Sequence, residues 1–179
     1  NVLVTDYRLP MEDVSAGERA TMGVIRDLVR FGYRVTFLPT NLAPVEKYQQ
    51  QLESMGVRVI TRNDGVSSPQ QFIAQHGHAF GLFYLIRVDV AEAILPIAHQ
   101  VSPNARIVFH APDLHFLREQ REAELFNDPT QQRMAAETRR RELGIMRSSD
   151  LVVVVSPVEK ELLQSVLPEK PVQVFQALY

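Results

Sequence analysis

Residues 106–118 read RIVFHAPDLHFLR, and the change of character within this stretch decides the fold. Residues 107–109 form a short apolar run of the kind that lies inside a parallel sheet. Pro112 prevents the strand from continuing. His110 and the polar residues after it therefore fall at or just beyond the carboxyl end of a strand, which is where open α/β sheets bind their ligands.

Similar apolar runs alternate with helical patterns along the whole chain. The predicted strands are residues 2–5, 35–39, 57–61, 82–86, 106–109, 151–155 and 172–175. A helix signal follows the first strand, where Ser15 and Glu18 have the spacing of a capping box. Residues 114–147 contain no strand pattern and predict two helices. We therefore expect an α/β fold with one doubly wound, Rossmann-like parallel sheet of about seven strands.

Composition narrows the classes of function. Of the 179 residues, 45% are hydrophobic and 22% are charged, which is typical of a single globular domain. The absence of cysteine excludes disulfides and thiolate chemistry. A formal net charge of -2 provides no long-range attraction to nucleic acid, and no apolar run approaches the ~20 residues that span a bilayer. These features predict a cytoplasmic protein without a nucleic-acid partner or a transmembrane segment, and they leave peripheral contact with a membrane open.

Polar residues follow several predicted strands, and a parallel sheet would bring them to one edge. Asp6 follows the first strand, Arg87 the fourth and Ser156 the sixth. His110 is the candidate catalytic residue, because an imidazole can donate, accept or relay a proton near neutral pH. Gly17, at a predicted helix start, would let backbone amides approach a phosphate or a sugar oxygen. The alternative is structural: strands leave the core through polar residues, and Gly17 belongs to a helix cap.

Other site chemistries lack their patterns. His76 and His78 flank a glycine at a predicted helix end without a third ligand nearby, and His110 and His115 do not have the spacing of a zinc motif on a helix. No Gly-x-Gly-x-x-Gly or Walker pattern is present to bind a dinucleotide or a triphosphate, and no Gly-x-Ser-x-Gly is present for a serine hydrolase. We expect no metal and no cofactor.

Arginines 139–141 form a short basic run in the predicted helical segment. Glu137 and Glu142 flank the run, and no aromatic residue interrupts it. This pattern favours a solvated helix face over a nucleic-acid-binding patch.

Motifs distributed over essentially the whole chain follow the pattern of one enzyme family. They are residues 2–6 with Ala16-Gly17 opening a helix, the entry to the second strand at residues 28–35, the run His110-Ala111-Pro112-Asp113, and the block of residues 140–163. In that block a helix leads into a buried strand that ends at a serine. In these features the chain resembles the amino-terminal domain of retaining GT-B glycosyltransferases of family 4, also called group 1.

The resemblance implies that residues 1–179 are a single acceptor-side domain and that the donor-binding carboxyl-terminal domain is absent from this chain. It implies a nucleotide-sugar donor, bound mainly by the missing domain, and a hydroxyl-bearing acceptor in the synthesis of a glycan or cell-surface polysaccharide. Gly17 would line the interdomain cleft near the donor diphosphate, and His110 would face the reacting sugar. Asp113 and Ser156 would shape the acceptor side.

Two other interpretations remain open. The chain could be half of a different GT-B enzyme, such as a nucleotide-sugar epimerase or an inverting transferase. It could also be a non-catalytic α/β binding or receiver-type module, with Asp6 in an acidic phosphoacceptor pocket. The receiver-type reading requires clustered acids after the first and third strands, whereas the predicted third strand ends in Thr61-Arg62.

Overall fold

Seven parallel strands form a single sheet in the computed structural model, which describes residues 1–126 and 128–175. Their order across the sheet is β3-β2-β1-β4-β5-β6-β7. The strands are β1 (Val2–Asp6), β2 (Val35–Pro39), β3 (Arg58–Val59), β4 (Leu82–Ile86), β5 (Arg106–His110), β6 (Leu151–Val154) and β7 (Val172–Val174). Every neighbouring pair is parallel, so all carboxyl ends lie along one edge. The prediction of a doubly wound α/β fold is confirmed.

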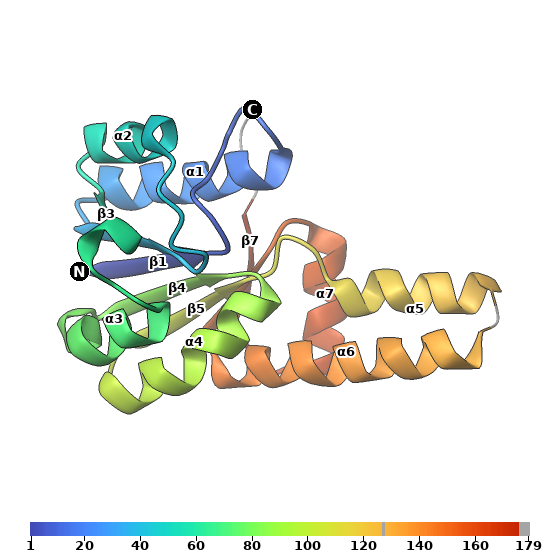
Figure 1. The fold of residues 1–179 in the computed structure, drawn as a ribbon. Helices are drawn as coiled ribbons and strands as arrows, with labels where there is room; N and C mark the ends of the chain where they lie inside the picture. The colour runs from blue at the N-terminus through green and yellow to red at the C-terminus, as the bar shows by residue number, and fades with distance from the viewer. Residues whose placement is uncertain (127, 176–179) are drawn as a thin grey trace.

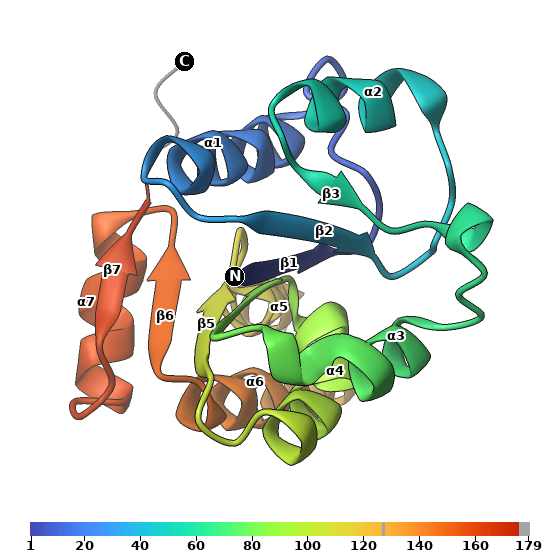
Figure 2. The same ribbon diagram turned by 90° about the vertical axis from the view of Figure 1, so that its left-hand side faces the viewer.

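Helices cover both faces of this sheet (Figures 1 and 2). The helices are α1 (Ala16–Arg30), α2 (Glu46–Ser54), α3 (Pro69–His76), α4 (Val88–Val101), α5 (His115–Phe126), α6 (Pro129–Ser148) and α7 (Pro157–Val166), with short 3-10 turns η1 (Arg62–Asp64) and η2 (Gly77–Ala79). One core layer packs beneath α1 and α2, with Met22 and Phe37 among its fully buried side chains. The opposite layer includes Phe83, Phe109 and Met146.

α5 and the first part of α6 extend away from the sheet (Figure 1), whereas Met146 near the end of α6 packs in the core. The two helices pack along each other beyond the carboxyl edge, and α6 also contacts α4. Arg141 of α6 forms ion pairs with Asp89 at 3.3 Å and Glu92 at 2.6 Å, both on α4. These contacts fix the position of the hairpin relative to the start of α4.

Two local predictions differ from the structure. The third strand was expected to span residues 57–61, but β3 has only two residues. It lies at the edge of the sheet, and Thr61 caps η1 instead of continuing the ladder. The capping box at the start of α1 is only half formed: the Ser15 hydroxyl accepts a bond from the Glu18 amide, whereas the Glu18 carboxylate turns to other partners.

Candidate functional site

A cavity of about 500 Å³ opens at the carboxyl edge where β1 and β4 lie side by side. After β1 the chain crosses toward β2, and after β4 it crosses toward β5 on the other side, so the connections diverge here. Such a switch point is the usual ligand crevice of an open α/β sheet. The walls of this switch-point pocket include Tyr7, Arg8, Ser15, Glu18, Arg87 and Asp89.

Asp6 and Arg87 form an ion pair at the pocket wall, in which the carboxylate is buried and the guanidinium is partly exposed. The Asp6 side chain is only 2% exposed, and its carboxylate accepts bonds from Arg87 Nε at 2.7 Å, from the Tyr7 amide at 2.6 Å and from Thr21 Oγ1 at 3.1 Å. Burial raises the pKa of Asp6, and the Arg87 guanidinium opposes that rise. Asp6 therefore orients Arg87, and it is Arg87 that lines the cavity.

A second pair, Arg8 with Glu18, repeats this arrangement. Glu18 is buried, and its carboxylate accepts bonds from Arg8 Nε at 2.7 Å and from the Met11 amide at 2.8 Å. These bonds tie the loop after β1 to the first turn of α1. The sequence predicted Glu18 only as half of a capping box and gave no signal that it pairs with Arg8 of the loop after β1.

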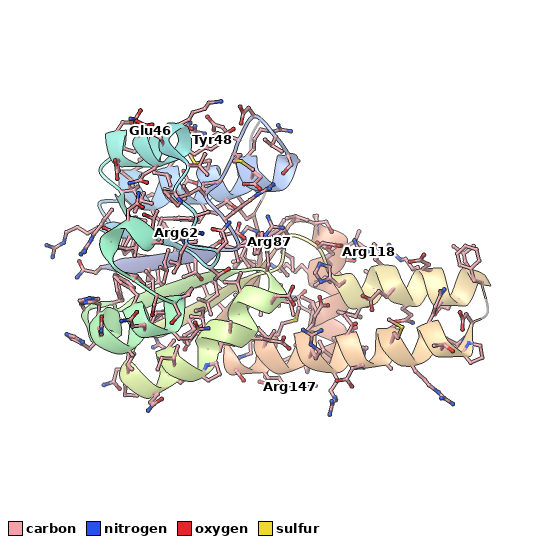
Figure 3. All side chains as sticks on the ribbon, in the orientation of Figure 1. Glu46, Tyr48, Arg62, Arg87, Arg118 and Arg147 are labelled. Atoms are coloured by element: carbon pink, nitrogen blue, oxygen red, sulfur yellow. The ribbon has the colours of Figure 1, made fainter. Side chains whose placement is uncertain are left out.

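Gly17 lies beside the Arg87 guanidinium. A Cβ atom placed on Gly17 would stand 3.9 Å from Arg87 Nη2, which is ordinary contact. The structure thus brings together three of the predicted site residues: Asp6, Gly17 and Arg87. In Figure 3, Arg87 lies at the carboxyl edge near the start of α4, and Arg118 lies farther out on α5.

His110, the predicted catalytic residue, is the last residue of β5 and lies beneath the surface. It is 1% exposed, its Nδ1 lies 3.1 Å from the Tyr84 hydroxyl, and its Nε2 is buried without a hydrogen-bond partner among the described residues. The Phe175 ring packs against it with 5.9 Å between ring centroids. Burial, with a smaller contribution from the Arg87 charge, lowers the pKa of His110 to about 4, so the imidazole is neutral at pH 7.

Asp113 and Ser156 lie farther along the same edge and do not line the switch-point pocket. Asp113 follows β5 and pairs with Arg118 Nη1 at 2.9 Å. Ser156 follows β6 and caps α7: its hydroxyl accepts from the Glu159 amide at 3.1 Å, and the Glu159 carboxylate accepts from the Ser156 amide. Two strands, β4 and β5, separate β6 from β1.

Glu142 is a buried acid that the sequence interpretation misplaced. The expectation of a solvated face on both sides of arginines 139–141 is wrong for Glu142, which is fully buried. Its carboxylate accepts bonds from the His115 and Phe116 amides at 3.1 and 3.2 Å and so caps the start of α5. Burial raises the pKa of Glu142. The sequence pattern around Glu142 did not predict its burial, because the neighbouring charged residues are exposed and Glu142 resembles them.

No protein-family model matches the sequence, and no curated protein matches it. Within residues 1–126 and 128–175, the helices are too short or too polar to cross a bilayer. The same described residues contain no group of three histidine, aspartate or glutamate side chains arranged to hold a metal ion. Fold and pocket together define a doubly wound α/β protein with a crevice at its topological switch point.

Proposed function

We propose that the chain is the acceptor-side domain of a retaining GT-B glycosyltransferase, which moves a sugar from a nucleotide-sugar donor to a hydroxyl acceptor. The observation that supports this most is the switch-point pocket beside Gly17, Asp6 and Arg87. Gly17 and Asp6 belong to the motif that carries the family resemblance, and the pocket lies where a ligand crevice is expected in such a sheet.

Glycosyl transfer requires stabilisation of the leaving diphosphate and exclusion of water from the reacting atoms. Arg8 and Arg87 offer cationic groups at the wall of the pocket. The cavity is open, so a second domain carrying most of the donor site would have to close it. In this proposal the activity belongs to the two domains together, and His110 takes part once its Nε2 becomes accessible from the cleft.

The test uses the polypeptide in which this chain is joined to its donor-binding domain. Incubation with a panel of nucleotide sugars and acceptor glycans should release nucleoside diphosphate, whereas residues 1–179 alone should show negligible turnover. His110→Ala should lower turnover by about a hundredfold, the scale of general acid–base assistance. His78→Ala, which removes an exposed imidazole, is the control and should leave turnover unchanged.

Circular dichroism of His110→Ala checks that the fold persists. Unchanged turnover in that variant would show that His110 has no part in the mechanism. Turnover by residues 1–179 alone would contradict the proposal that both domains are required for activity. Anomeric analysis of the product separates a retaining from an inverting transferase. Conversion of the nucleotide sugar without an acceptor would indicate an epimerase, and no reaction with any donor would favour a non-catalytic binding module.

A further inference from the structure

We infer that the switch-point pocket binds an anionic group, a phosphate or a carboxylate, through the guanidinium groups of Arg8 and Arg87. An anionic group is thus the ligand class that we add to the proposed function. Only the view that this ligand is a substrate rests on the proposed function.

Each arginine is anchored at Nε by a buried carboxylate. Arg87 bonds Asp6 and Arg8 bonds Glu18, both at 2.7 Å, and the two acids are 2% and 3% exposed. The arginine side chains remain 38% and 42% exposed and line the cavity. No described residue forms a hydrogen bond with their terminal Nη groups. A guanidinium fixed at Nε presents its Nη donors in a set direction, a geometry that suits the paired oxygens of phosphate or carboxylate.

Arg87 occupies a backbone conformation that normally belongs to glycine. Its φ is +79° and its ψ is 150°. The conformation is stabilised by the bond from the Arg87 amide to the His110 carbonyl at 3.0 Å and by the Asp6 contact. Non-glycine residues in this region are strained, and such strain concentrates at functional sites. The chain therefore maintains a strained backbone at the position whose guanidinium enters the pocket.

The carboxylates near the cavity, which could act as hydrogen-bond acceptors, already have partners in the protein. The Asp6 and Glu18 carboxylates are already engaged by bonds from several protein donors. Asp89 lies at the rim, 89% exposed, where Arg141 pairs with it. The first turn of α4 forms part of the wall, and no side chain among the described residues caps it. An entering anion meets hydrogen-bond donors on several sides.

The test is a titration of the ¹⁵N-labelled chain with inorganic phosphate, glucuronate and uncharged glucose. Phosphate or glucuronate should produce saturable shifts at the amides of Gly17, Glu18 and Asp89. Arg8→Ala and Arg87→Lys should each weaken binding by about tenfold, as expected when a charge-assisted hydrogen bond is lost. Arg106→Lys is the matched control: Arg106 also pairs with an aspartate at a strand end, but at the opposite edge of the sheet.

Saturation by phosphate alone assigns a phosphoryl ligand, saturation by glucuronate alone assigns a carboxylate, and saturation by both supports the anion site. The inference is overturned if neither anion saturates the wild-type chain, if glucose binds as tightly, or if Arg8→Ala binds like wild type. Arg8 is partly exposed, so this variant remains informative even if Arg87→Lys does not fold. Anion binding without transferase turnover would contradict the proposed function and leave the anion site supported. Turnover without anion binding would contradict the anion site and leave the proposed function supported.

Discussion

Among the buried ionisable residues near the carboxyl edge, three are stabilised in different ways. Asp6 is paired with Arg87, Glu142 is bonded by the amides at the start of α5, and His110 stays neutral beside Tyr84. Burial raises the pKa of both acids and lowers that of the imidazole. Of these three, Asp6 supports Arg87 from below, and Arg87 lines the switch-point pocket.

His110 should make the protein less stable in acid. Its folded-state pKa is about 4, below the ordinary value of 6.5, so the unfolded chain takes up the proton first as the pH falls. The His110 contribution is therefore constant above pH 6.5 and is lost between 6.5 and 4. Between pH 7 and pH 4.5, wild type should lose about 2–3 kcal/mol more unfolding free energy than His110→Gln. Urea denaturation at both pH values measures this, and parallel losses in the two proteins would contradict it.

At the scale of single elements, the helix caps carry both structure and candidate function. Ser156 caps α7 and is also a predicted substrate-binding residue. Ser156→Ala should cost about 1 kcal/mol of unfolding free energy, and Ser156→Asp should restore it, because aspartate also caps well. If Ser156 contacts the acceptor, Ser156→Asp should still lower turnover of the joined two-domain polypeptide.

Ser68→Ala provides the comparison, because Ser68 caps α3 through the Gln71 amide and is not a predicted site residue. It should cost a similar free energy in thermal or urea denaturation and leave turnover intact. Full turnover in Ser156→Asp would limit Ser156 to its capping role.

The local sequence pattern predicted the positions of the strands and helices well, but it predicted the contacts between their side chains poorly. Apolar runs located all seven strands, because a buried parallel strand must be apolar on both faces. The pattern could not show that β3 lies at the edge and stops after two residues. The pattern predicted that Asp6 and Arg87 lie at the same edge of the sheet. It could not predict the hydrogen bond between them, because the two residues are 81 positions apart in the sequence. Glu18 leaves its capping box for Arg8 because of how the loop folds, and that is a tertiary effect.

For the molecule as a whole, the order of the strands predicts where the native state is most protected. β1 and β4 lie inside the sheet and pair on both sides, whereas β3 and β7 each have one neighbour. In native-state hydrogen exchange at low urea concentrations, amides of Val4 and Leu85 should exchange only by global unfolding. The Val59 amide should exchange through local opening with a lower free energy. Equal protection of β1 and β3 would contradict this expectation.

The common direction of the strands also places residues 1 and 175 at opposite edges of the sheet. Residue 1 precedes β1 at the amino edge, and residue 175 follows β7 at the carboxyl edge, where the pocket also lies. A surface attachment or affinity tag on residue 1 would leave the crevice facing free solution in a biosensor experiment. A polypeptide fused after residue 175 would leave from the carboxyl edge of the sheet at β7, which β5 and β6 separate from β4.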